Sequence, residues 1–179
     1  PKRWYISHLV RTLRNYELNA INKVDGIAAI TYRDAAFFRG ETSKPVIDIP
    51  YGVDPDDFIP HYEIKKEPSL YHIGSMNWMP NEEGIRWFLN NVWDKLLMKN
   101  PDAKLYLAGR HMPQWLLKKK KKNVNVIGEV ADAKEFISNH DIAVVPLLSG
   151  SGIRIKIIES MAMGKTVITT RVGAEGIQY

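Results

Sequence analysis

Between residues 70 and 170, short apolar runs alternate with longer amphipathic runs, and this order restricts the fold more than any other feature. The apolar runs are 70–74, 104–109, 124–128, 142–148 and 166–170. The intervening runs, such as Pro80 to Leu96 and 152–163, place apolar side chains three and four positions apart, which is helical spacing. Several apolar runs have no polar face, as a sheet covered on both sides requires. The alternation predicts an α/β fold with a parallel sheet flanked by helices.

The ends of these expected strands form the first candidate site. Ligands of open α/β sheets bind outside the carboxyl ends of the strands. Several of the strands end in glycine, which lets backbone or ligand approach closely. The candidate loops are those that follow Gly74, Gly109, Gly128 and Leu148.

The residues before 70 have a different organisation. We expect a helix over 4–23, a strand over 26–31, a short helix over 34–38 and a strand over 46–49. Residues 54–69 are rich in Pro, Asp, Lys and Glu, which is typical of a linker. The expected division is a first domain portion over 1–53, a linker over 54–69 and an α/β domain over 70–179. Because the sequence starts without Met and stops after a strand-like run, we expect a fragment of a longer protein.

Composition excludes several classes of protein. The chain has no cysteine, which excludes a disulfide scaffold, a thiolate zinc site and a cysteine nucleophile. No run approaches the ~20 apolar residues of a membrane span, and no secretory signal is visible. The five histidines show no metal-ligand spacing, so we expect no metal site. The net charge of +5 favours anionic partners.

A run of five lysines, Lys118 to Lys122, is the most concentrated charge in the sequence. A solvated face is the favoured interpretation, and an anionic lipid surface or nucleic acid are the alternatives. The run lacks the interleaved aromatic residues of a single-strand binding surface, so we expect no nucleic-acid partner.

The segment from Pro146 to Glu159 carries the clearest chemical pattern. A Gly150-Ser151-Gly152 loop leads from a strand into a helix, where free N–H groups form an anion site. Arg154 and Lys156 lie in or near the first helical turn, and their cations suit a phosphate ligand. A carboxylate further on, Glu159, suits a sugar diol. Together they suggest a nucleoside diphosphate.

A simpler interpretation of the same segment stays open on spacing alone. Lys156 and Glu159 are three positions apart and are able to pair on a helix surface, which is worth ~0.2–0.5 kcal/mol. The two glycines then mark a plain turn, since a short glycine-rich loop is weak support for a phosphate site.

Residues 142 to 177, IAVVPLLSGSGIRIKIIESMAMGKTVITTRVGAEGI, resemble the signature of the carboxyl-terminal domain of glycosyltransferase family 4. This family is also called group 1 and has the GT-B fold. Supporting motifs run in order along nearly the whole chain, and several spaced motifs are more specific than one. They are Ile49 to Asp54, Ile73 to Met76 with Pro80-Asn81 and Trp87-Phe88, Leu107 to Arg110, and Val126 to Val130.

The resemblance implies an enzyme with two Rossmann-like domains and an active site in the cleft between them. The carboxyl-terminal domain binds a nucleotide-diphosphate-sugar donor, and the sugar passes to an acceptor hydroxyl, mostly with retention and without a metal or other cofactor. Residues 1 to about 50 resemble only the end of the amino-terminal, acceptor-side domain. The catalytic residues of that domain are therefore expected to be missing, and the fragment alone is expected to be inactive.

The resemblance to this family also suggests partners and a cellular location. The acceptor is expected to be a saccharide or a lipid-linked molecule, as in polysaccharide biosynthesis. We expect the protein in the cytoplasm or at the inner face of the membrane, where its basic charge suits peripheral contact. Two alternatives stay open: a nucleotide-sugar epimerase of the same fold, and a basic α/β module that binds nucleic acid.

By position in the resemblance, Glu159 matches the acidic residue that holds the nucleotide ribose. Arg154 and Lys156 are candidate diphosphate contacts. The sequence departs from the family at Ser151, where many members have a second Glu eight positions before the ribose-binding one. A hydroxyl does not replace that carboxylate charge, so the donor orientation is expected to depend on backbone N–H groups, Arg154 or Lys156.

The remaining expected donor contacts come from the loops at the strand ends. Backbone groups near the phosphates or sugar are expected from Gly150, Ser151, Gly152 and, on the opposite loop, Gly74. Backbone groups of Glu129 and Val130 are expected at the edge of the base. Arg110 is a further anion candidate, and a plain surface arginine is the alternative.

Overall fold

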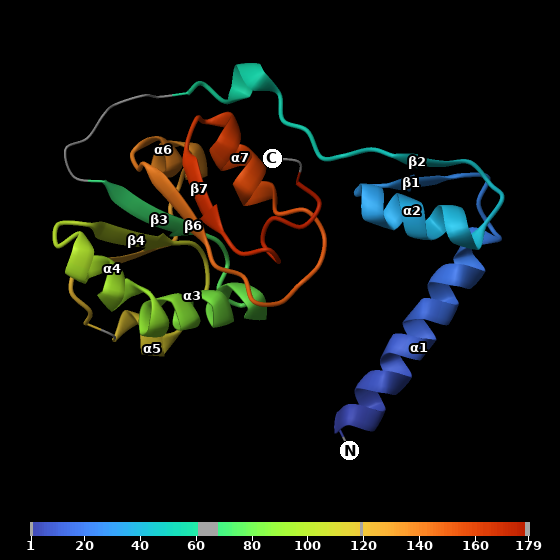
Figure 1. Cartoon of the computed structure of the whole chain (residues 1–179), viewed down its shortest axis with the longest axis horizontal. Helices are drawn as coiled ribbons and strands as arrows, with labels where there is room; N and C mark the ends of the chain where they lie inside the picture. Colours follow the sequence, from blue (N-terminus) through green and yellow to red (C-terminus); the bar gives the residue numbers. More distant parts are fainter. Residues whose placement is uncertain (1, 61–67, 119, 178–179) are drawn as a thin grey trace. The chain divides into compact units, whose positions relative to one another are not determined.

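The alternating segment forms one five-stranded sheet in which all neighbouring strands are parallel (Figure 1). The structure is a computed structural model that describes residues 2–60, 68–118 and 120–177. The strands are β3 (Ser69–Ile73), β4 (Lys104–Ala108), β5 (Val124–Gly128), β6 (Ile142–Val145) and β7 (Thr166–Thr169). Their spatial order is β5-β4-β3-β6-β7. The α/β expectation is confirmed.

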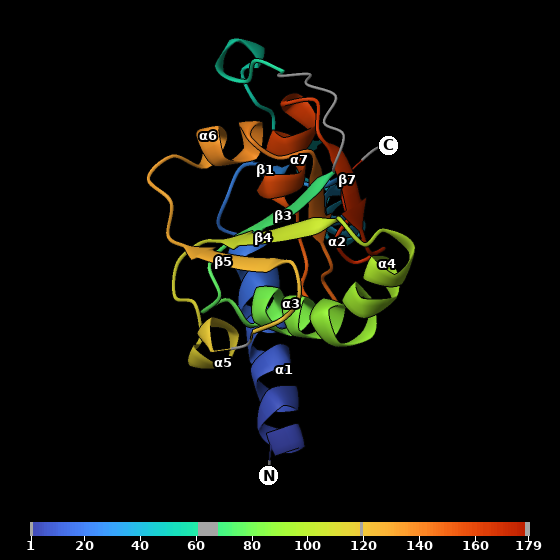
Figure 2. The same cartoon turned by 90° about the vertical axis from the view of Figure 1, so that its left-hand side faces the viewer.

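Helices cover both faces of this sheet, which Figures 1 and 2 show from two directions. One face carries α3 (Met79–Asn91), α4 (Trp93–Lys99) and α5 (Gln114–Leu117), and the other carries α6 (Ala133–Ser138) and α7 (Ile155–Ala162). Successive strand residues alternate between the two layers. Leu70 packs with Phe88 and Trp93, whereas Tyr71 packs with Phe136. Both faces are therefore apolar, as the strand sequences predict.

Two element boundaries differ from expectation because of particular residues. Strand β6 ends at Val145 rather than Leu148, since Pro146 has no N–H for the ladder. Helix α7 begins at Ile155 rather than residue 152, because Gly150 and Gly152 have positive φ angles that a helix does not allow.

The helix expected from Pro80 to Leu96 is two helices that meet at Val92. The break accompanies the burial of Trp93, whose indole N–H donates to the Lys122 carbonyl oxygen at 2.9 Å. A buried indole needs such an acceptor, and periodicity alone does not show where it lies.

The chain divides into two compact units between Tyr51 and Gly52. The first unit contains α1 (Lys2–Ile21), β1 (Ile27–Ala29), α2 (Tyr32–Glu41) and β2 (Val46–Asp48), with β1 and β2 paired in parallel. No helix in the described ranges is long and apolar enough to cross a bilayer.

The segment expected as a linker, residues 54–69, begins within the second unit. Its short 3₁₀ turn, η1 (Pro55–Asp57), is followed by Phe58, which is buried in the same cluster as Tyr71. The ammonium of Lys134 donates to the Asp57 carbonyl oxygen at 3.0 Å. Residues 61–67 of the expected linker lie outside the described residues.

Candidate functional site

The strand order places one point of the carboxyl edge where a ligand crevice is expected. Counted from β3 along the chain, the order is 3-2-1-4-5, so the winding reverses between β3 and β6. Gly74 directly follows β3, and the segment from Pro146 to Lys156 follows β6. Two of the four loops that the sequence predicted as candidate sites therefore flank the switch point of the sheet.

Backbone hydrogen bonds join the loops at this edge. The Gly74 N–H donates to the Ala108 carbonyl at 3.0 Å, and the Gly109 N–H donates to the Gly128 carbonyl at 2.7 Å. The Met76 N–H donates to the Arg110 carbonyl at 2.9 Å. The loops after β3, β4 and β5 therefore form one connected rim.

The two glycines of this rim are required for different reasons. Gly109 has a φ of +132°, and a Cβ there would lie 2.6 Å from the carbonyl carbon of Gly74. At Gly74 a Cβ would collide with the Lys156 ammonium. The sequence predicts that other groups approach these glycines closely. At Gly109 the neighbouring group is the backbone of Gly74, and at Gly74 it is the ammonium of Lys156.

Lys156 lies in the first turn of α7 and reaches across to α3. Its Nζ donates to Asn81 Oδ1 at 2.8 Å, and Asn81 Nδ2 donates to the Ser75 carbonyl at 2.9 Å. The Asn81 side chain, 4% exposed, therefore joins α3 to both α7 and the loop after β3. Burial, together with a smaller effect of the Arg154 cation, lowers the pKa of Lys156 to about 8.

His72, on β3 beside this lysine, stays neutral. Its Nδ1 lies 2.8 Å from the Val144 carbonyl oxygen, and the ring is almost fully buried. Burial lowers the pKa of His72 to about 3, with a smaller effect of the Lys156 charge. The site therefore gains no cation from this histidine.

Arg154 occupies the N-cap position of α7 rather than its first turn. The side chain is only 5% exposed, and its Nη1 donates to the carbonyl oxygens of Ser151 and, at 2.7 Å, Gly152. Its Nε and Nη2 are buried without a hydrogen-bond partner in the described part of the chain. Burial lowers the pKa of Arg154, and the Glu175 carboxylate opposes that effect. Arginine nevertheless stays charged, since its reference pKa is far above neutrality.

The Gly150–Gly152 loop curls around this guanidinium. Gly150 and Gly152 have φ angles of +112° and +84°, in the left-handed region that favours glycine. A Cβ at Gly150 would lie 3.0 Å from Arg154 Nη2 and 3.4 Å from the Trp78 ring. The Arg154 guanidinium carbon lies 5.5 Å from the centre of that ring, which is cation–π range. Ser151, the departure from the family pattern, is exposed.

Glu159 lies one turn beyond Lys156 on α7 and is partly exposed. Its carboxylate makes no hydrogen bond or ion pair with any residue that the structure describes. The simpler interpretation, a surface pair between Lys156 and Glu159, is therefore wrong, because the ammonium turns to Asn81. The carboxylate is left available to a ligand.

Buried polar contacts hold α7 on the sheet. The Tyr71 hydroxyl donates to Ser160 Oγ at 2.8 Å, and Ser160 Oγ donates to the Lys156 carbonyl at 2.6 Å. Burial raises the pKa of Tyr71 to about 12, so this donor keeps its proton. These contacts fix the helix that carries Lys156 and Glu159.

The candidate residues at the ends of β4 and β5, which are Arg110, Glu129 and Val130, have other contacts than Arg154 and Lys156. Arg110 Nε and Glu129 Oε1 lie 2.8 Å apart with both side chains mostly exposed, a geometry that contributes little stability. Arg110 thus forms an ion pair with a carboxylate, whereas the Arg154 guanidinium donates to backbone carbonyl oxygens. Val130 packs on the cluster around Tyr71. Among the described residues, no three His, Asp or Glu side chains gather closely enough to hold a metal ion.

Sequence reasoning missed Asn81 as a part of this site. It lies four positions before Ile85, on the apolar face of α3. A polar residue on the buried side of a helix needs a hydrogen-bond partner, and that signal marked Asn81 in the sequence.

Comparisons with known sequences identify the family of this chain. Residues 67–178 match the profile of the family described as glycosyl transferases group 1. A Klebsiella pneumoniae protein, described as an uncharacterized 44.6 kDa protein in the cps region, is 31% identical over 120 residues. That match covers 60% of this chain and 30% of the Klebsiella protein.

Solved structures show the likeness of fold. TarM superposes with a TM-score of 0.70 at 15% identity, over 90% of this chain and 33% of TarM. Anabaena Alr3699/HepE, solved with UDP and glucose, superposes with a TM-score of 0.66 at 16% identity, over 93% of this chain and 50% of HepE. The sheet and its helices match the carboxyl-terminal domains of GT-B proteins, and the expected Rossmann-like architecture is confirmed. The chain spans half or less of the length of each of these relatives.

Proposed function

The chain belongs to the group 1 glycosyltransferases, and from that premise we propose that it supplies the nucleotide-sugar donor site of a retaining glycosyltransferase. The whole protein would move a sugar from a nucleotide diphosphate to an acceptor hydroxyl. A saccharide or lipid-linked acceptor in polysaccharide biosynthesis fits the cps-region relative. Peripheral membrane contact belongs to the same proposal.

The proposal depends chiefly on two neighbouring cations, the buried Arg154 and the half-buried Lys156. Neither cation makes an ion pair with a carboxylate in the described ranges, and the Glu175 carboxylate acts on Arg154 only from beyond ion-pair distance. Burying like charges together is unfavourable unless an anion neutralises them. The N-terminus of α7 adds its dipole and free N–H groups at the same point. A diphosphate has the charge and the acceptor oxygens for this position.

Each residue then has a part in binding or orientation. Lys156 and Arg154 would hold the diphosphate, with backbone groups of Gly74 and the Gly150–Gly152 loop near the phosphates and sugar. Glu159, one turn away, would accept hydrogen bonds from the ribose hydroxyls. Backbone groups at Glu129 and Val130 would meet the base.

This arrangement suits a reaction in which charge develops on a leaving diphosphate. Cations and dipoles fixed before the reaction stabilise that charge without reorganising, which is often the largest catalytic effect. The Asn81 side chain keeps Lys156 directed at the end of β3. UDP is the first nucleotide to test, since HepE was solved with it.

Calorimetric titration with UDP and with GDP tests the site. We expect Glu159→Gln to weaken the preferred nucleotide about tenfold to a hundredfold, because hydrogen bonds to a charged group are worth ~1.5–3 kcal/mol. Asp102→Asn is the matched control, since it neutralises an exposed carboxylate in the turn before β4, at the opposite edge. Equal affinity in wild type and Glu159→Gln would refute the role of Glu159. Absence of binding to either nucleotide would refute the donor site.

A further inference from the structure

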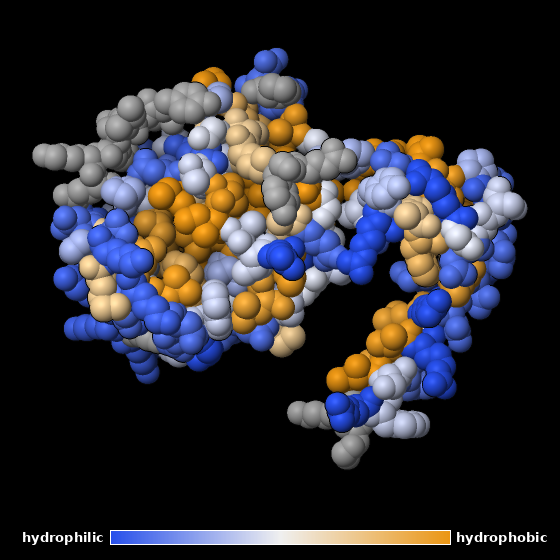
Figure 3. All heavy atoms as spheres, viewed as in Figure 1, coloured by the Kyte–Doolittle hydropathy of each residue, from blue (hydrophilic) through white to orange (hydrophobic). Residues whose placement is uncertain are grey.

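The positive charge of the chain is concentrated in two segments that flank β4 in the sequence. Residues 93–104 and 114–126 carry eight lysines and two aspartates, a net +6, whereas the whole chain carries +5. The first segment contains α4 and the residues that enter β4, and the second contains α5 and the residues that enter β5. Figure 3 shows hydrophilic surface gathered over α4 and α5. The rest of the chain is nearly neutral.

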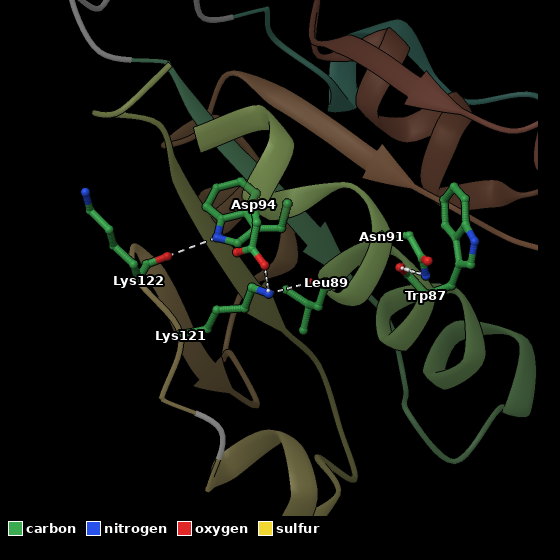
Figure 4. A network of polar contacts seen from close by, with 7 residues as sticks. Trp87, Leu89, Asn91, Asp94, Lys121 and Lys122 are labelled. Atoms are coloured by element: carbon green, nitrogen blue, oxygen red, sulfur yellow. Dashed lines mark hydrogen bonds and ion pairs between the residues drawn. The ribbon is translucent and has the colours of Figure 1, made fainter. Parts of the chain in front are cut away.

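One lysine of the run anchors this surface. Lys121 Nζ donates to the Leu89 carbonyl at 2.6 Å and to Asp94 Oδ2 at 2.8 Å (Figure 4). The buried Trp93 donates to the Lys122 carbonyl, and Figure 4 shows the Lys122 side chain directed away from that contact. Lys121 and the backbone of Lys122 are therefore held against α3 and α4.

The outward side chains combine charge with apolar surface. Lys118, Lys120 and Lys122 are exposed, and so is Leu117, at 51%. Met98 is 76% exposed and lies one turn after Asp94 on α4, on the side that contacts Lys121. An open hollow of about 510 Å³ is lined by Leu117, Lys120, Lys121, Lys122, Val124 and Val126.

We propose that Lys118, Lys120 and Lys122, with Leu117, form a basic edge that binds an anionic phospholipid surface. Neighbouring lysines each attract acidic lipids, and exposed apolar side chains beside them suit the headgroup boundary. Nucleic acid fits less well, because single strands need exposed aromatic rings. Trp93 is buried, and Trp115 is held by Glu82 at 2.7 Å. This proposal rests on the membrane contact of the proposed function and not on the donor site, since lipid binding requires no nucleotide.

Vesicle flotation tests the basic edge with the whole chain. Wild type is mixed with phosphatidylcholine vesicles that contain about one-third phosphatidylglycerol, and with pure phosphatidylcholine vesicles. Because each lysine near an acidic membrane contributes about fivefold, Lys118→Gln, Lys120→Gln and Lys122→Gln together should weaken partitioning about a hundredfold. The triple Lys→Arg variant should bind like wild type.

The matched control is Arg3→Gln, Arg11→Gln and Lys23→Gln, which removes the same charge from exposed positions of the first unit. A loss of at most a few fold in this control, with a large loss in the lysine variant, supports the basic edge. Equal losses would mean that net charge alone drives binding, and the proposal would be wrong. The proposal would also be wrong if wild type did not bind acidic vesicles. It would be wrong, too, if wild type bound duplex DNA or polyuridine with a steep salt dependence and did not bind vesicles.

Discussion

Lys156→Met should remove a pH dependence of stability that the wild-type chain has above neutrality. The lysine has an ordinary pKa of 10.5 when unfolded, and burial beside Arg154 lowers the pKa to about 8 in the folded chain. Methionine is unbranched and of similar length, so it fills the same space without a charge. The substitution isolates the cost of burying this ammonium.

The sign follows from proton binding in the two states. Below about pH 8 the lysine is charged in both states, so the folded chain bears the full cost of burial. Between about pH 8 and 10.5 the unfolded chain holds the proton more firmly, so stability rises with pH. Between pH 7 and about 10.5, the expected gain is about 3 kcal/mol, since a tenfold change in proton affinity corresponds to ~1.4 kcal/mol.

Urea unfolding of both proteins across this pH range measures the effect. The lost hydrogen bond to Asn81 shifts the variant by a constant, and other titrating groups cancel in the difference. As the pH rises from 7 to about 10.5, the free energy of unfolding of wild type should therefore increase by about 3 kcal/mol relative to that of Lys156→Met. The curve of stability against pH for Lys95→Met, a substitution at an exposed position of α4, should run parallel to the wild-type curve. Parallel curves for Lys156→Met as well would show that no buried ammonium titrates there.

The same titration should appear in nucleotide binding. A diphosphate beside Lys156 favours its charged form, so binding of UDP near pH 9 should take up about one proton in wild type and none in Lys156→Met. Calorimetry in buffers of different ionisation enthalpy measures the proton uptake. Binding without uptake would place the diphosphate away from this lysine.

The backbone contacts and the α7 anchor give two further predictions. Gly109→Ala should destabilise the chain by on the order of 3 kcal/mol, because φ is +132° and the Gly74 carbonyl occupies the Cβ position. Gly40→Ala, in α2 with open space around the Cβ, should instead be neutral or stabilising by up to ~1 kcal/mol, and equal thermal shifts in both variants would contradict the argument. Tyr71→Phe should cost ~1 kcal/mol at neutral pH by removing the donor to Ser160, and an unchanged unfolding midpoint would show that this hydrogen bond adds nothing.

Much of the fold was predictable because it is encoded locally. Apolar runs and helical spacing between residues 70 and 170 determined the order of strands and helices and the parallel sheet. The same order brought the loop after Gly74 and the loop before Arg154 to one edge. The chemistry of the Arg154, Lys156 and Glu159 pattern was likewise visible in the sequence, because it lies within six consecutive residues.

Only the tertiary structure decided what these side chains contact. Spacing allowed Lys156 to pair with Glu159, yet its partner is Asn81, which is 75 positions away. A solvated face was the favoured interpretation of the lysine run, yet Lys121 donates to the Leu89 carbonyl and to Asp94, on helices that come earlier in the chain. The physical reason is the same in both cases. Periodicity reports which face of an element is buried, whereas the partner of a buried polar group depends on which elements pack together.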